Sequence, residues 1–175
     1  MKKVLLIVVF AILASGSAMA QYKHSIGGVV GSMNGFSYKV MATNNFAISV
    51  DLGVKLTEGA FDRYSASVFD LEVNPNFMYE ANATGGLYWF VGGGFSLGYG
   101  SFNYAGWRTD CGKFGLNAIG GLEYKFGIPL TLQFDFRPGF GLLFYERPQY
   151  WLNGDIYRNP DYFDWGLNLS LRYAF

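Results

Sequence analysis

The chain has 175 residues, with 13 basic and 13 acidic side chains and therefore no formal net charge. Charged residues make up only 15% of the sequence, well below the roughly 25% of an ordinary soluble domain. The balanced charge argues against a nucleic-acid partner, and the low charged fraction, together with 19% aromatic residues, indicates a domain with one side in an apolar solvent.

The first twenty residues have the composition of a secretory signal. Two lysines precede an apolar run over 4–14, and Ala18-Met19-Ala20 supplies a small-x-small cleavage site. We therefore expect a signal peptide over 1–20 and a mature chain that begins at Gln21. The apolar run is shorter than the about 20 residues that a membrane helix needs, so a transmembrane helix is not predicted.

Eight segments that alternate between two kinds of side chain follow the signal, and this period of two is typical of β-strands. They are predicted at about 24–32, 36–42, 46–56, 66–80, 87–101, 114–126, 130–142 and 165–175. The alternation is strongest in the last segment, where large apolar residues occupy the odd positions and small or polar residues the even ones.

The connections between these strands differ in length. Met33-Asn34-Gly35 is predicted as a tight hairpin turn, because Asn-Gly favours the two-residue turns that join antiparallel strands. Short turns are also expected at 44–45, 81–86 and 127–129, and longer loops at 57–65, 102–113 and 143–163. Short turns at one end and longer loops at the other are typical of barrels with periplasmic turns and extracellular loops.

The size of the side chains orients the strands. Leucines and aromatic residues collect on one face, and glycine, serine, asparagine and charged residues on the other. The interior of an eight-stranded barrel is only wide enough to be filled by side chains, so the second set should face inward and the first set should face lipid. The sequence therefore predicts an all-β fold, an eight-stranded antiparallel up-and-down transmembrane β-barrel.

The predicted interior holds charges of both signs. Buried charges cost several kcal/mol unless they are paired, so we expect a network of ion pairs across the lumen and not an open pore. The residues expected in this network are Lys39, Asp51, Lys55, Asp70, Glu72, Glu80, Glu123, Lys125, Asp135, Arg137 and Arg172.

With the signal, the eight strands and the terminal Leu169-Ser-Leu-Arg-Tyr-Ala-Phe175 in view, residues 21–175 resemble a small outer-membrane β-barrel of the OmpX and OmpA transmembrane-domain type. In that family the last strand resembles the signal read by the barrel-assembly machinery, which implies this role for Tyr173 and Phe175. The resemblance also implies contact with outer-membrane lipid and lipopolysaccharide, a monomeric state and no cofactor. The very short first loop departs from family members with a protruding first hairpin.

Few residues suggest a catalytic or metal-binding site. His24 is the only histidine and is expected at the periplasmic rim, and nothing around it in the sequence supports a set of nucleophile, base and orienting group. Cys111 is the only cysteine, so it cannot form an internal disulfide, and it has no basic neighbour at helical geometry to lower its pKa. Asn153, Asp155, Asp161 and Asp164 lack the spacing of an EF-hand loop. We therefore predict no catalytic, cofactor-binding or metal site.

The 143–163 loop is the strongest candidate for an interaction. Aromatic residues beside arginine are enriched in protein interfaces and also suit a rim in contact with lipopolysaccharide. The candidate contact residues are Tyr145, Arg147, Tyr150 and Trp151. The leading hypothesis is a non-enzymatic barrel that contributes to envelope integrity or surface interactions. A narrow channel for small solutes and a lipid A-modifying enzyme are the alternatives.

Overall fold

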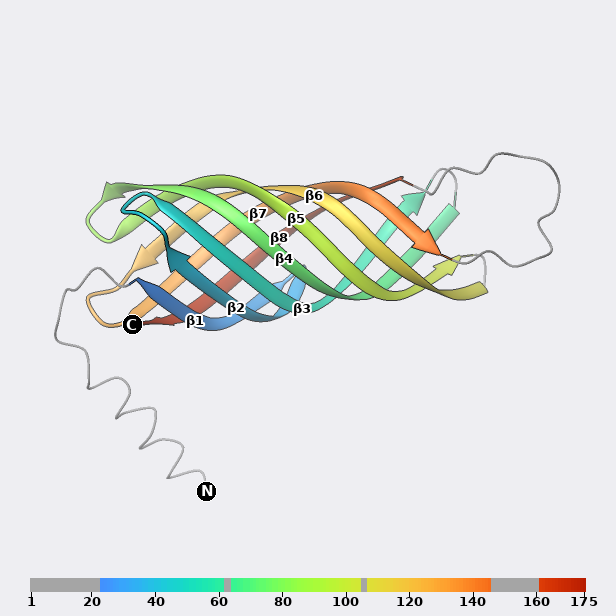
Figure 1. Cartoon of the computed structure of the whole chain (residues 1–175), viewed down its shortest axis with the longest axis horizontal. Helices are drawn as coiled ribbons and strands as arrows, with labels where there is room; N and C mark the ends of the chain where they lie inside the picture. Colours follow the sequence, from blue (N-terminus) through green and yellow to red (C-terminus); the bar gives the residue numbers. More distant parts are fainter. Residues whose placement is uncertain (1–22, 62–63, 105–106, 146–160) are drawn as a thin grey trace, which may run out of the picture.

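The computed structural model describes residues 23–61, 64–104, 107–145 and 161–175, which form a closed antiparallel β-barrel with the strands in chain order (Figure 1). The strands are β1 (His24–Gly31), β2 (Met33–Met41), β3 (Phe46–Phe61), β4 (Tyr64–Thr84), β5 (Leu87–Tyr104), β6 (Trp107–Lys125), β7 (Leu130–Tyr145) and β8 (Asp161–Ala174). The predicted fold is confirmed. Within these ranges, no helix is long and apolar enough to cross a membrane.

The barrel closes where β1 pairs with β8, from Ser25 opposite Ala174 to Gly31 opposite Asn168. Beyond this ladder, the His24 and Phe175 backbones exchange hydrogen bonds of 3.1 and 2.8 Å. The described N-terminus and the C-terminus therefore lie at the same end as the β2–β3, β4–β5 and β6–β7 turns, which we name the turn end (Figure 1). The opposite end, where β3, β5 and β7 finish, is the loop end.

Side chains alternate between the lumen and the outer surface along every strand. Lys39, Asp51 and Arg172 are buried in the lumen, whereas Phe36 on the outer surface is 72% exposed. Large apolar residues are exposed on all eight strands. The bulky set thus faces outward, because the narrow interior of an eight-stranded barrel accommodates only the smaller and polar set at full density.

The first hairpin turn does not lie where the Asn-Gly motif predicts it. The chain turns at Gly31 and Ser32, and Gly31 adopts a φ of 136°, which favours glycine. Asn34 and Gly35 are already in β2, where Gly35 pairs with Gly53. Asn34 still supports the turn, because its side chain accepts a hydrogen bond from the Gly31 amide (3.4 Å) and donates one to the Gly31 carbonyl (3.3 Å).

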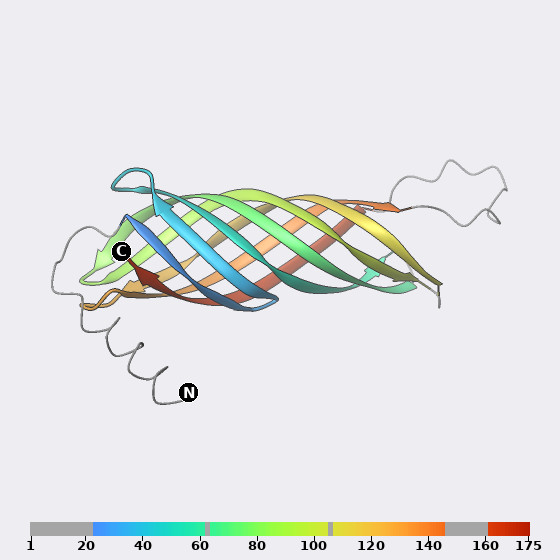
Figure 2. The same ribbon diagram turned by 60° about the horizontal axis from the view of Figure 1, so that its bottom comes forward.

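Two predicted loops are strands instead. The β3–β4 pairing continues to Phe61 opposite Tyr64, and the β5–β6 pairing continues to Tyr104 opposite Trp107, so the predictions for 57–65 and 102–113 are wrong. β4 has 21 residues, about twice the 9–11 that cross a bilayer. The β1–β2 hairpin is much shorter, and Figure 2 shows it ending well before β3–β6 at the loop end.

Candidate functional site in the barrel lumen

Charged side chains fill the lumen in three groups of ion pairs. In the described part of the chain, six basic residues and seven acidic residues take part. The basic residues are Lys39, Lys55, Lys113, Lys125, Arg137 and Arg172, and the acidic residues are Asp51, Asp70, Glu72, Glu80, Glu123, Asp135 and Asp164. Because both signs are nearly balanced, each buried charge has an opposite charge close by.

The central cluster is held by Arg137 and by Arg172, which lies nearer the turn end. Arg137 Nη2 donates to Asp51 Oδ2 at 2.9 Å and to Asp135 Oδ1 at 3.2 Å. Arg172 donates through Nε to Ser37 Oγ at 2.8 Å and through Nη1 to the side chain of Gln133 at 2.9 Å.

Further polar side chains join the two halves of the central cluster. The Ser37 hydroxyl donates to Asp51 Oδ1 at 2.5 Å, and Asn168 Nδ2 donates to Asp135 Oδ1 at 3.1 Å. Hydrogen bonds thus connect β2, β3, β7 and β8 across the lumen, and they hold these strands in one arrangement.

The turn-end cluster combines two lysines with two glutamates. Lys39 Nζ contacts Glu80 and donates to Glu123 Oε2 at 2.8 Å. Lys125 Nζ lies 3.2 Å from Glu80 Oε2 and 3.8 Å from Glu123 Oε2. Arg172 Nη1 approaches Glu123 from the central side at 3.6 Å. Three positive charges therefore surround two carboxylates at this level.

The loop-end cluster is centred on Lys113. Its Nζ donates to Glu72 Oε2 at 2.6 Å and lies 3.4 Å from Asp70 Oδ2 and 3.5 Å from Asp164 Oδ2. Lys55 Nζ contacts the same Asp164 carboxylate at 2.6 Å. This cluster joins β3, β4, β6 and β8 above the tip of the short first hairpin.

Lys113 and Asp164 are the members of these clusters that the sequence did not predict, because Lys113 ends the predicted 102–113 loop and Asp164 lies between the predicted 143–163 loop and the strand predicted from Trp165. Extending the strand alternation would have placed them correctly. Lys113 is two residues before Gly115 on the inward face of β6, and Asp164 is two residues before Gly166 on the inward face of β8. The same extension applies to Cys111, which is buried in β6 and does not lie in a loop.

Apolar side chains complete the filling of the lumen on the β3–β6 side. Ala47, Met78, Phe90 and Ile119 form one buried group, against which Met41 packs. The Phe90 ring also lies 5.9 Å from Lys39 Nζ. Gly121 leaves room for the Phe90 ring, which a Cβ at that position would meet.

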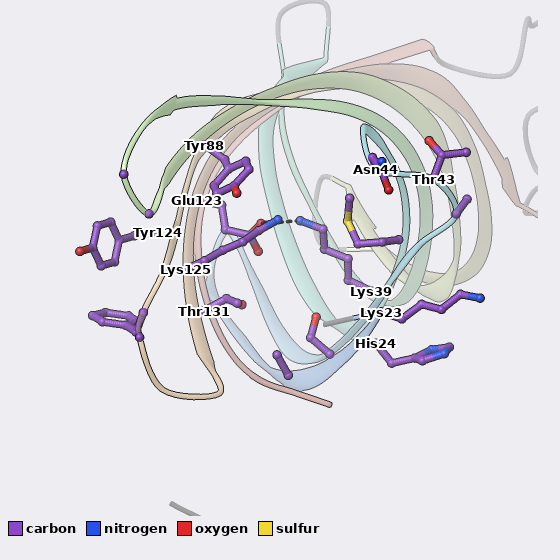
Figure 3. Close-up of a pocket in the computed structure, with 18 residues that line it drawn as sticks. Lys23, His24, Lys39, Thr43, Asn44, Tyr88, Glu123, Tyr124, Lys125 and Thr131 are labelled. Atoms are coloured by element: carbon purple, nitrogen blue, oxygen red, sulfur yellow. Dashed lines mark hydrogen bonds and ion pairs between the residues drawn. The ribbon is translucent and has the colours of Figure 1, made fainter. Parts of the chain in front are cut away.

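A cavity of about 910 Å³ opens at the turn end (Figure 3). Lys39, Tyr88, Glu123, Lys125 and Thr131 line it, together with residues of the β2–β3 turn. Lys39 and Lys125 reach toward each other from opposite walls. Lys39, Lys125 and Glu123 of the turn-end cluster thus line this cavity, and Glu80 contacts both lysines.

The residues proposed as an assembly signal lie at the closure seam. Tyr173 is half-buried and pairs with Ile26 of β1, and the exposed Phe175 ring stacks on His24 with ring centroids 5.8 Å apart. His24 Nδ1 is 2.8 Å from the Tyr38 hydroxyl on the outside of the barrel. A histidine held there has no serine or cysteine nucleophile among its described partners.

The loop candidates fall largely outside the described residues. Arg147, Tyr150 and Trp151 do so entirely, and Tyr145 is the last residue of β7, where its backbone pairs with Cys111. Of the four candidate calcium ligands, Asn153 and Asp155 lie outside the described residues, Asp161 begins β8, and Asp164 belongs to the loop-end cluster. In the described ranges, no group of His, Cys, Asp and Glu side chains is arranged to hold a metal ion.

Comparisons with known proteins identify the fold. No protein-family model matches the sequence, and no curated protein matches it either. Among solved structures, Neisserial surface protein A shares 14% sequence identity, covers 87% of this chain and 94% of its own, and superposes with a TM-score of 0.53. The N-terminal β-barrel domain of Pseudomonas aeruginosa OprF shares 14% identity, with 87% and 96% coverage and a TM-score of 0.52. The chain therefore has the fold of small eight-stranded outer-membrane β-barrels.

Proposed function

We propose that this protein is a monomeric, non-enzymatic integral outer-membrane barrel that contributes to envelope integrity or to surface interactions through its loops. The observation that carries the proposal is the distribution of side chains between two surfaces: large apolar residues are exposed on all eight strands, and the charged residues described in the lumen form ion pairs. In water such an apolar surface would promote aggregation, whereas in a bilayer it contacts lipid.

Export and assembly follow from the two ends of the chain. The expected signal peptide over 1–20 lies outside the described residues, and its removal would leave a chain beginning at Gln21. Tyr173 and Phe175 would then be read by the barrel-assembly machinery. With the short turns in the periplasm, the loop end would face the cell exterior.

The loops are the proposed contact with the cell surface. We infer that Tyr145, Arg147, Tyr150 and Trp151 contact lipopolysaccharide or a surface partner, because arginine binds phosphate groups and aromatic rings favour the membrane interface. The long β3–β6 strands support this proposal, since their paired ends reach beyond the length needed to span a bilayer.

The lipid A-modifying alternative has less support. Acyl-transfer chemistry needs a nucleophile and a base within hydrogen-bond reach. The base that the sequence offers, His24, is bonded to Tyr38 on the outer surface at the turn end, away from the loop end where lipopolysaccharide would lie.

Membrane fractionation combined with gel mobility tests the proposal. We expect the protein in the outer-membrane fraction, and we expect unboiled protein to migrate differently from boiled protein on SDS gels, because a closed barrel resists detergent. Recovery in the soluble periplasmic fraction, with the same mobility before and after boiling, would contradict the proposal and favour a soluble ligand-binding barrel.

A further inference from the structure

We propose that the turn-end cavity binds a small polar ligand that carries one oxyanion, a carboxylate or a phosphate group. The side from which the ligand enters is the side of the chain termini. That this side is the periplasm rests on the proposed function, but the binding chemistry does not.

The size of the cavity suits a small molecule. Its volume of about 910 Å³ falls within the range of roughly 300–1,000 Å³ that is typical of small-molecule sites. Figure 3 shows it open toward the mouth of the barrel, with side chains from β2, β5, β6 and β7 around it. The ion pairs of the turn-end cluster and the Phe90 group (Ala47, Met78, Phe90 and Ile119) separate the cavity from the rest of the lumen. A ligand could therefore enter without passing through the lumen.

The charges around the cavity favour an anion. Lys23, Lys39 and Lys125 line the cavity, and Glu123 is the one carboxylate among its described lining residues. Glu80 contacts Lys39 and Lys125 but does not line the cavity. The side chains that a ligand would meet are therefore more basic than acidic, and they favour an oxyanion. Each ammonium group has three N–H donors. Lys39 contacts both Glu80 and Glu123, and Lys125 donates to Glu80 at 3.2 Å, so both lysines can still donate to a ligand.

Thr131 supplies a second, independent observation. It pairs directly with Lys125 across the β6–β7 ladder and lines the cavity. Its side chain is more than nine-tenths buried, and its hydroxyl has no hydrogen-bond partner among the described residues. Buried hydroxyl groups normally have a partner, and an oxyanion held by Lys125 would provide one.

Tyr88 holds Lys125 in place. The Lys125 ammonium lies 4.0 Å from the centroid of the Tyr88 ring, a favourable position for a cation over an aromatic face. Lys125 is also the most accessible cation of the cluster, with 27% of its side chain exposed. It can therefore meet a ligand at the mouth while its stem stays ordered.

The experiment is a titration of the protein in detergent micelles, followed by NMR, with three sugars of similar size as probes. Glucuronate carries a carboxylate, glucose 6-phosphate carries a phosphate, and glucose carries no charge. We expect saturable shifts at resonances around the cavity with one or both anionic sugars and none with glucose. The anion that binds more tightly identifies the chemical source. No saturable shift with either anion, or equal binding of glucose, would overturn the proposal.

Three variants locate the site. Lys125→Met keeps the aliphatic stem but removes the charge, and we expect the affinity for the anionic sugar to fall by about tenfold or more. Thr131→Val keeps the shape and should weaken binding by about threefold to tenfold. Thr84→Val is the control, because Thr84 is exposed at the β4–β5 turn and is not among the residues that line the cavity, and its affinity should not change.

Folding is scored separately by the mobility of unboiled protein. If the Lys125→Met variant does not fold, the affinity of the Thr131→Val variant tests the site instead. Unchanged affinity in a folded Thr131→Val variant, or an equal loss in Thr84→Val, would overturn the site. If the protein is not in the outer membrane, the fractionation experiment will show it, and the result of the titration will not change.

Discussion

Arg137 illustrates how single residues hold the interior together. It lies between the carboxylates of Asp51 and Asp135, and all three side chains are buried. We expect Arg137→Met to lower the free energy of unfolding by about 3 kcal/mol or more, because two buried carboxylates lose their opposite charge. Urea titration of the protein in lipid vesicles, followed by gel mobility, measures the change.

A second substitution separates lost charge from lost packing. Adding Asp51→Asn to Arg137→Met removes one of the two uncompensated carboxylates, so the double variant should be more stable than Arg137→Met alone. Lys23→Met, at an exposed position, should unfold like the parent protein. A double variant no more stable than the single one would show that packing, and not charge, explains the effect.

The turn between β1 and β2 depends on the backbone conformation of Gly31. Gly31 has a φ of 136°, and a Cβ there would meet the Leu167 carbonyl of β8. We expect Gly31→Ala to lower the free energy of unfolding by about 1–3 kcal/mol, the cost of a strained backbone. Gly127→Ala is the matched control, since nothing lies within 4 Å of a Cβ at that turn position. Equal stability of the two variants would show that the turn relaxes easily.

The sequence predicts best those strands whose two faces meet different environments. Alternation from Trp165 to Phe175 indicated both the strand and its outward face, because one side meets apolar surroundings and the other a packed polar lumen. Beyond the bilayer both faces of a strand can be polar, so the alternation fades and the pairing near Phe61 and Tyr104 was mistaken for loops. Pairing partners within the lumen, such as Lys113 with Glu72, depend on the register between strands, which no single segment specifies.

The filling of the lumen decides whether the barrel can conduct ions or small solutes. The lumen contains ion-paired clusters at three levels, and the buried apolar group around Phe90 fills its β3–β6 side. Arg172, Glu123 and Phe90 are each almost fully buried, so very little of their surface is open to water. A solute could pass only if several ion pairs broke at once, and buried pairs are costly to separate.

We therefore expect the folded protein to show no resolvable single-channel current in planar bilayers at neutral pH. The reason is the filled lumen, and not a failure to insert, so insertion must be established in the same sample from the mobility of unboiled protein. Protein unfolded by boiling, added in the same detergent, controls for leaks caused by the detergent. Discrete, repeatable current steps from the folded sample alone would mean that the ion pairs open under voltage, and the narrow-channel alternative would then replace the non-conducting barrel.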